Sequence, residues 1–194
     1  MPRITRESLL TLEAYAKTRK EFRAKAIAHK KLRTVHVGEH VTLLFEDELT
    51  IRYQIQEMLR VERTFEQAGI DDELDAYNPL VPDGTNLKAT MLIEYEDVSE
   101  RQAALARLRG IESRVYLLVG DAPALHAIAD EDLPRENETK TAAVHFLRFE
   151  LPPPLVAALK QGARLAVGVD LPAYTVAPVA VGDETRRALI ADLS

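Results

Sequence analysis

Short apolar runs separated by very few residues dominate the second half of the chain. The runs at 114–119 and 125–129 are five residues apart, and those at 165–169 and 174–179 are four residues apart. Parallel strands need a crossover of about a dozen residues or more, so such close neighbours pair antiparallel. There are further strand-like runs at 89–95 and 142–151, and the second of these follows a charged connection at 130–140. They alternate with helical patterns at 98–109, after Pro152 to Pro154 and at 184–192. We therefore predict an α+β fold with a mostly antiparallel sheet and covering helices.

The first half predicts a long helix, a hairpin and two more helices. The N-terminal helix should begin at Arg6 or Ser8, with Thr5 or Ser8 as its cap, and end near Leu32. The β-branched runs 34–37 and 41–45 flank Gly38 and predict a hairpin. A three-residue loop at 38–40 places the apolar residues on one face, whereas a two-residue loop would split them, so we prefer the three-residue loop. Helices at 48–65 and 71–77 follow. The apolar stripe of the N-terminal helix, in which Arg19 also falls, consists of Leu12, Tyr15, Ala16, Phe22 and Ala26.

Length and composition are those of a single domain, 1–194. With 194 residues, of which 46% are hydrophobic and 29% charged, the chain is long enough to bury a core without covalent cross-links. Turn residues at 78–79 and 82–84 close the first half. A boundary near Asn86 is therefore an alternative, which would separate a helix–hairpin–helix part, 1–86, from an α+β part, 87–194.

The composition excludes several classes of function. Without cysteine the chain has no thiol nucleophile and no cysteine-ligated zinc or iron–sulfur centre, and we expect no cofactor. A net charge of −6 disfavours a general nucleic-acid binder, because phosphate contacts need a basic surface. The sequence shows neither a membrane-spanning apolar run nor a signal-peptide pattern, so we expect a cytoplasmic protein.

One carboxylate stands out on the second predicted helix. The apolar stripe of this helix consists of Ile51, Ile55, Met58 and Phe65, and Glu62 falls near its middle. If Glu62 is buried there, it could serve as a metal ligand or a proton-transfer group. The interpretation that we favour is structural: Glu62 pairs with an arginine such as Arg148, or is exposed where the helix runs past its sheet.

The other side of the same helix carries Arg52, Gln56 and Arg60 at one-turn intervals, followed by Arg63. Together with Glu62, the first three form a candidate ligand-binding set, because guanidinium groups bind phosphates and carboxylates through two parallel hydrogen bonds. A solvated helix face with local ion pairs is the more common outcome for such a row, and we favour it here.

The five histidines are scattered along the chain. His36 and His40 have a spacing that suits chelation from a helix, but the local pattern predicts a strand and a turn, from which the two side chains converge poorly. His145 shares a strand face with apolar residues, which favours a buried core histidine. A mixed metal site formed by His36, Glu62 and His145 is the alternative that the sequence leaves open.

A basic stretch, Lys17 to Arg33, is relieved only by Glu21. Cations near a helix C-terminus suit the helix dipole without any partner. The one interleaved aromatic residue, Phe22, lies on the apolar stripe rather than where a base would stack. A solvated helix is the first interpretation, an acidic protein partner is the second, and nucleic acid is not expected. The apolar stripe also leaves a homodimer open.

Several segments resemble a bacterial family of uncharacterised proteins that is known only as a domain of unknown function. The likeness extends over nearly the whole chain and is carried by ITRESLL (4–10), HVGEHVTLLFED (36–47), RYQIQEMLR (52–60), ELDAYNPL (73–80) and HFLRFEL (145–151). The resemblance implies no catalytic residues. Members are often encoded near rubrerythrin-like and iron–sulfur oxidoreductase proteins, which implies an accessory role in a redox or peroxide-defence system.

Two functions follow from these observations. The first is a non-catalytic accessory or partner protein of a cytoplasmic redox or peroxide-defence system. The second is a metal- or small-ligand-dependent enzyme with a site around Glu62. We favour the first, because the chain has no thiol and its histidines are dispersed.

Overall fold

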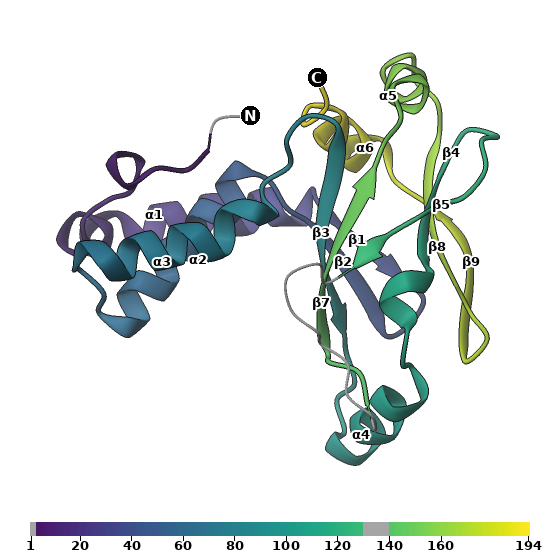
Figure 1. The fold of residues 1–194 in the computed structure, drawn as a ribbon, viewed down its shortest axis with the longest axis horizontal. Helices are drawn as coiled ribbons and strands as arrows, with labels where there is room; N and C mark the ends of the chain where they lie inside the picture. Colours follow the sequence, from purple (N-terminus) through teal and green to yellow (C-terminus); the bar gives the residue numbers. More distant parts are fainter. Residues whose placement is uncertain (1–2, 130–139) are drawn as a thin grey trace.

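The computed structural model describes residues 3–129 and 140–194 and shows two stacked antiparallel sheets from which an arm of three helices projects (Figure 1). The first sheet has the strand order β1-β2-β3-β7-β6, and the second has the order β5-β4-β8-β9. The strands are β1 (Thr34–Val37), β2 (Val41–Phe45), β3 (Asn86–Ile93), β4 (Val115–Val119), β5 (Leu125–His126), β6 (Ile128–Ala129), β7 (Val144–Glu150), β8 (Leu165–Leu171) and β9 (Tyr174–Ala180). The predicted α+β class and the antiparallel pairing are confirmed.

The main hydrophobic core lies between the two sheets. Alternate residues of each strand face inward, as the two-residue period of a strand requires. Fully buried side chains come from both sheets, among them Val37, Leu43, Phe45, Met91 and Phe149 from the first and Val115, Leu117, Val167 and Val169 from the second.

The hairpin has the predicted register. His36 pairs with Thr42, and Val37 pairs with Val41, which leaves a three-residue loop at 38–40. Gly38 takes the left-handed conformation in this loop, with φ of 75°, and a Cβ there would also meet the Tyr174 side chain. Glycine is therefore required at this position for both conformation and space.

The arm consists of α1 (Leu12–Lys31), α2 (Glu48–Glu62) and α3 (Gln67–Tyr77), which lie side by side away from the sheets (Figure 1). Their apolar faces form a small second core with Ile4, Ile51, Ile55, Leu59, Leu74 and Val81. The predicted helix ends need correction. Residues 6–8 form a separate 3-10 turn, η1, and α1 begins after Thr11, whose hydroxyl caps the amide of Ala14. α2 ends three residues early because Arg63 takes the left-handed conformation, with φ of 55°.

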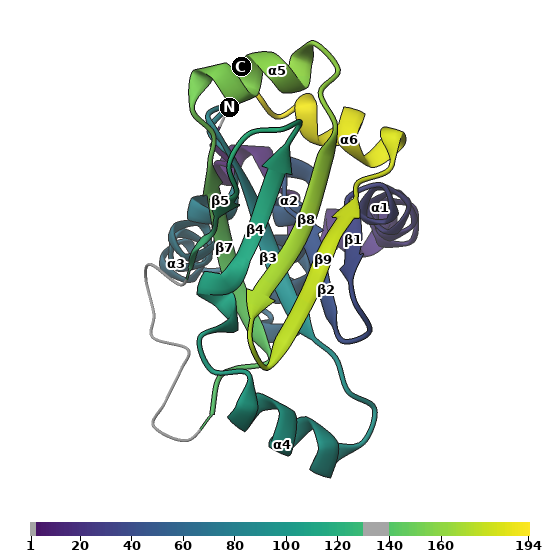
Figure 2. The same cartoon turned by 90° about the vertical axis from the view of Figure 1, so that its right-hand side faces the viewer.

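The remaining helices close the ends of the sandwich. α4 (Val98–Arg107) lies at one end, while α5 (Pro153–Lys160) and α6 (Asp183–Ile190) lie at the other (Figure 2). Two further 3-10 turns are η2 (Asn78–Leu80) and η3 (Ile111–Arg114). Among the described elements, no helix lies over the outer face of the second sheet in this view. None of the helices in the described part of the chain combines the length and apolar character needed to cross a bilayer.

One organisational prediction needs correction. The single strand predicted at 125–129 is divided between the sheets: β5 pairs with β4, β6 pairs with β7, and the buried Ala127 joins them. β2 pairs with β3 along its whole length, so the hairpin and the later strands share one sheet; the alternative boundary near Asn86 stays a prediction. Most of the charged connection predicted at 130–140 lies outside the described residues.

Candidate functional site

The cations of α1 that turn inward all have partners within the arm. Arg19 forms two hydrogen bonds of 2.8 Å with the carboxylate of Glu57 on α2, and the Tyr15 hydroxyl donates to the same carboxylate at 2.6 Å. The hydrogen bonds from Arg19 are the main cause that lowers the pKa of Glu57 to about 2. Lys30 lies over the ring of Tyr53, 5.4 Å from its centroid.

The aromatic residues of the arm are also turned inward. The ring of Phe22 lies between those of Tyr15 and Tyr53, at centroid distances of 5.9 and 6.1 Å. The predicted inward position of Phe22 is therefore confirmed, and the ring is not presented to a nucleic-acid base. Ala16, which the sequence places on the same stripe, is exposed.

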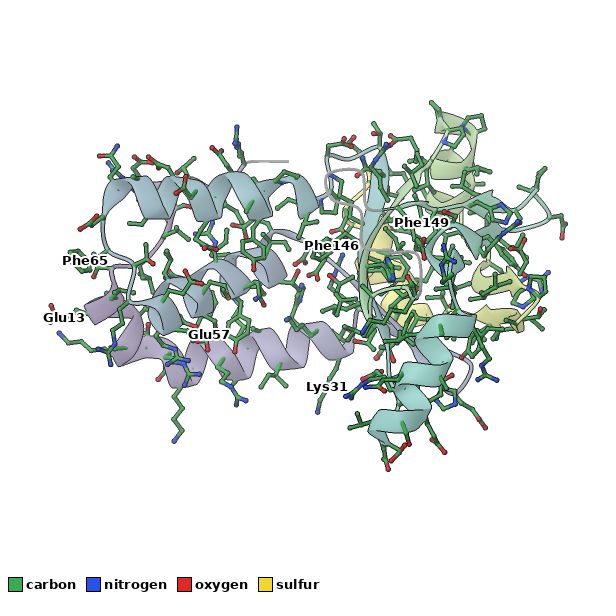
Figure 3. The ribbon with its side chains drawn as sticks, turned by 60° about the horizontal axis from the view of Figure 1, so that its bottom comes forward. Glu13, Lys31, Glu57, Phe65, Phe146 and Phe149 are labelled. Carbon is green, nitrogen blue, oxygen red and sulfur yellow. The ribbon has the colours of Figure 1, made fainter. Side chains whose placement is uncertain are left out.

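A solvent-exposed side of α1, next to Arg19 and Lys30, carries cations of a different kind. At 100° per residue, Lys20, Arg23, Ile27 and Lys31 fall within an arc of about 80°, and this set is called the outer face of α1 below. All four side chains are exposed, and Ile27 keeps 37% of its surface accessible. Lys31 projects away from the arm (Figure 3). Within residues 3–129 and 140–194, none of the three cations forms a hydrogen bond or an ion pair.

The last cation of the basic stretch, Arg33, is buried at the junction between the arm and the sandwich. Its guanidinium donates to the carbonyl oxygens of Phe45 and Glu46, at 2.9 and 3.1 Å, and to the carboxylate of Asp192. It also lies 3.4 Å from Asp47, the cap of α2, which binds His29 in turn. We call these four residues, His29, Arg33, Asp47 and Asp192, the joint.

Burial and charge act differently on the two carboxylates of the joint. Burial by itself would raise the pKa of Asp47, but Arg33, the Thr50 amide and His29 outweigh it, so this pKa lies below its ordinary value. At Asp192 burial is the larger effect, and its pKa is raised in spite of Arg33. The joint therefore belongs to the folded structure and is not available to a partner.

The predicted ligand row on α2 is occupied by contacts within the chain. Gln56 is buried, accepts from the amide of Leu10 at 2.7 Å and donates to the carbonyl of Leu10 at 3.2 Å. Arg52 bonds Glu48 and the carbonyl of Ser8, while Arg60 donates to Glu57 at 3.2 Å. Gln56 and Arg52 hold the N-terminal segment against α2, whereas Arg60 pairs within the helix.

Glu62 is exposed in the last turn of α2. The helix runs past the sheet into the arm, and the neighbouring apolar residues Val61 and Phe65 retain 63% and 75% of their surface. Phe65 lies at the tip of the arm, far from the sheets (Figure 3). The apolar stripe thus continues beyond the elements that could cover it, and the position of Glu62 on the stripe does not bury its carboxylate.

The structure does not bring His36, Glu62 and His145 together. His36 lies on the outer face of the first sheet, 3.0 Å from the Thr42 hydroxyl, which donates to Glu94. His145 is fully buried on the opposite face of that sheet, 2.9 Å from the Thr141 hydroxyl, as expected for a core histidine. Among the described residues, no group of three His, Asp or Glu side chains is placed to hold a metal ion.

One buried carboxylate, Glu46, is not among the candidate residues that the sequence predicts. It lies between two cavities of about 250 and 290 Å³ at the junction of the arm and the first sheet. The signal available in the sequence was that Glu46 directly follows an alternating strand whose buried residues are Val41, Leu43 and Phe45; Glu46 itself is only 7% exposed.

Comparison with known proteins places the chain in a family. A family model described as "Protein of unknown function (DUF3501)" matches residues 3–193, and no curated protein matches. A crystal structure described as a novel protein of unknown function from Burkholderia pseudomallei is 56% identical, with 100% of each chain covered and a TM-score of 0.96. The resemblance to a domain of unknown function is confirmed, while the neighbourhood of rubrerythrin-like proteins stays a prediction. The chain belongs to the DUF3501 family of proteins of unknown function.

Proposed function

We propose that this protein is a non-catalytic partner protein that docks on an acidic protein surface through the outer face of α1. The observation that supports the proposal is the division of cations on α1. Arg19, His29 and Lys30 are matched by Glu57, Asp47 and Tyr53. The outward Lys20, Arg23 and Lys31 have no such match among the described residues.

A local excess of positive charge on a chain with a net charge of −6 has a consequence for association. Complementary charge steers encounter and fixes register more than it adds affinity. Ile27, at the centre of the outer face, supplies apolar surface that a partner would cover. An acidic patch with a small apolar centre is therefore the surface that fits this face.

Two other occupants fit the outer face less well. A nucleic acid would be held only by phosphate contacts, because Phe22, Tyr15 and Tyr53 are turned into the arm. A second copy of this chain, paired through the same face, would bring like charges together and so be repelled at low salt. A homodimer through another surface is compatible with the proposal.

The chain resembles a family whose members are often encoded near rubrerythrin-like and iron–sulfur oxidoreductase proteins. This resemblance supports a narrower class of partner. We propose an oxidoreductase of a redox or peroxide-defence system. Because the chain contains no cysteine, its contribution to such a system would not involve thiol–disulfide exchange.

The test is affinity capture from native bacterial lysate with the wild-type chain and two charge-reversal variants. The first variant, Lys20→Glu/Arg23→Glu/Lys31→Glu, reverses the outer face. The matched control, Lys160→Glu/Arg164→Glu/Arg187→Glu, reverses three exposed cations on and near α5 and α6. We expect an acidic oxidoreductase to be retained by the wild type and the control and lost by the outer-face variant.

The salt dependence of retention distinguishes a charged interface from an apolar one. Retention should decrease as the salt concentration rises, because exposed charges are screened within about 8 Å at physiological ionic strength. Equal retention by the two variants, or retention that does not respond to salt, would exclude the outer face of α1 as the docking surface. Recovery of an acidic protein that is not an oxidoreductase would keep the interface and reject the redox role.

A further inference from the structure

The junction between the arm and the first sheet encloses a cavity of about 290 Å³. The outer face of β2, β3 and β7 forms one wall, and α2 with the turn η2 forms the other. Phe146 of β7 lies at this junction (Figure 3). A second cavity, of about 250 Å³, adjoins the first through the shared lining residues Glu46, Leu80 and Phe146. Ligand sites commonly occupy such clefts between structural units.

Glu46 projects its carboxylate into this junction and is 7% exposed. The Thr90 hydroxyl donates to Oε1 at 2.6 Å, and the Thr50 hydroxyl donates to Oε2. An ionised carboxylate offers about four acceptor sites, so each oxygen can accept a further hydrogen bond. The two threonines hold the carboxylate in place without neutralising it.

No positive side chain in the described part of the chain forms an ion pair with Glu46. Lys30 lines the same cavity, but its ammonium lies over the ring of Tyr53. Lys88 lines the adjoining cavity and donates to the carbonyl of Pro79 at 2.5 Å. A buried carboxylate without a counter-charge is unfavourable.

The joint shows how this chain treats its other buried carboxylates. Asp47 and Asp192 are buried to a similar extent, 9% and 6% exposed, and both lie beside the guanidinium of Arg33. Glu46 differs from them because no cation among the described residues bonds its carboxylate: the cations that line its cavities, Lys30, Lys88 and Arg148, contact the Tyr53 ring, the Pro79 carbonyl and Glu150. The position that a counter-charge would occupy is therefore open to a ligand.

We propose that this junction cavity binds a small organic cation, an amine or an amidine with an apolar body. Its N–H groups would donate to Glu46, and its body would lie against Phe146 and Leu80, with Tyr77 on the far wall. A cation next to aromatic rings gains further stabilisation. A divalent metal ion fits less well, because Ca²⁺ and Mg²⁺ need several oxygen ligands and Glu46 is the single carboxylate among the described residues that line the cavity.

The test uses benzamidine as the probe, with benzamide as its neutral analogue, in calorimetric titrations of the full chain near neutral pH. We expect benzamidine to bind and benzamide to bind about tenfold more weakly or worse, because a charged hydrogen bond to a buried carboxylate is lost. The variant Glu46→Gln should lose about tenfold in benzamidine affinity for the same reason. Glu62→Gln, an exposed carboxylate on the same arm, should bind as the wild type does.

A second variant keeps the proposal testable if Glu46→Gln fails to fold. Leu80→Trp fills the cavity from the side of η2 and should abolish benzamidine binding while leaving Glu46 unchanged. Three results would overturn the proposal: no binding of benzamidine, equal binding of benzamidine and benzamide, or displacement of benzamidine by Mg²⁺ at physiological concentration. Unchanged affinity in a folded Glu46→Gln variant would do the same.

Discussion

In the sandwich, two sheets enclose an apolar core in which Phe45 and Phe149 are fully buried. In the arm, side-chain amides and ion pairs supply many of the contacts between segments. Gln56 makes two hydrogen bonds to the backbone of Leu10, and Asn78 makes two, of 3.0 Å each, to the backbone of Ile4. These side chains therefore satisfy the backbone groups of the segment before α1. In a sheet, the backbone of a neighbouring strand would do so.

The difference shows what each kind of contact can specify. Apolar burial is non-directional and grows with the area removed from water, so it stabilises the two sheets without fixing every atom. The arm buries a smaller apolar cluster, and its polar contacts hold particular backbone atoms in place. We therefore expect the sandwich to resist pH and to respond to lost volume, and the arm to respond to lost hydrogen bonds and to acid.

The largest expected effect is in the sandwich. Phe149→Ala should lower the free energy of unfolding by about 4 kcal/mol, because it removes a fully buried ring and leaves a cavity between two sheets. Leu59→Ala, in the small core of the arm, should cost about 2 kcal/mol, since the surrounding helices can relax into the space. Urea unfolding followed by circular dichroism measures both. Equal costs would show that the arm is packed as tightly as the sandwich.

The next effect is at the joint, where the two regions meet. Arg33→Met keeps the apolar stem but leaves Asp192 buried without a cation and Asp47 with His29 alone, so it should cost about 3 kcal/mol. Adding Asp192→Asn to Arg33→Met should recover part of the loss, because the unpaired charge of Asp192 is removed. If the double variant is no more stable than the single one, the cost arises from lost packing and not from unpaired charge.

A smaller effect is expected for a single polar contact of the arm. Gln56→Leu preserves the volume but leaves the backbone amide and carbonyl of Leu10 without their partner, at a cost of about 1–2 kcal/mol. Native-state hydrogen exchange should show faster exchange of the Leu10 amide. The matched control is Arg60→Gln, on an exposed position of the same helix, which should change stability by less than about 0.5 kcal/mol. Unchanged protection of Leu10 in Gln56→Leu would contradict the role of this amide.

The sequence predicts the sandwich better than the arm for a physical reason. Apolar and polar residues alternate along a strand because its side chains alternate between the core and the outer face. The hairpin register of β1 and β2 and the core position of His145 therefore follow from the positions of apolar residues alone. The division of 125–129 between β5 and β6 does not, because Leu125 to Ala129 is one apolar run whichever sheet each residue joins. Local pattern carries no information about such a change of sheet.

The candidate site was predicted only in part. A helical wheel correctly places Phe22 inside the arm. It also puts Glu62 on the apolar stripe, and since a wheel cannot show where α2 leaves the sheet, the exposed position that we favoured was one of two structural alternatives. Gln56 and Arg33 look like solvated polar residues in the sequence, since their partners, Leu10 and Asp192, lie 46 and 159 positions away. Glu46 was missed for the same reason: Thr90 and the cavity come from distant segments.

An effect of about the same size, which depends on pH, is the response of the arm to acid. Hydrogen bonds from Arg19 lower the pKa of Glu57 from 4.5 to about 2 in the folded protein. Because the pKa of Glu57 is lower in the folded protein, its contribution to the free energy of unfolding is fully present above about pH 4.5. This contribution is lost as the pH falls from about 4.5 toward 2. Its size should be about 1–2 kcal/mol after allowing for solvent screening of Arg19, whose side chain is 35% exposed.

The variant Glu57→Gln should therefore cost about 1–2 kcal/mol near neutral pH and almost nothing near pH 2, so that the stability curves converge in acid. Asp47, whose pKa is also lowered, titrates in both proteins, so the difference between the curves isolates Glu57. If the stability curves of Glu57→Gln and the wild type stay parallel down to pH 2, the contacts of Glu57 with Arg19 and Tyr15 stabilise the arm through packing and not through charge.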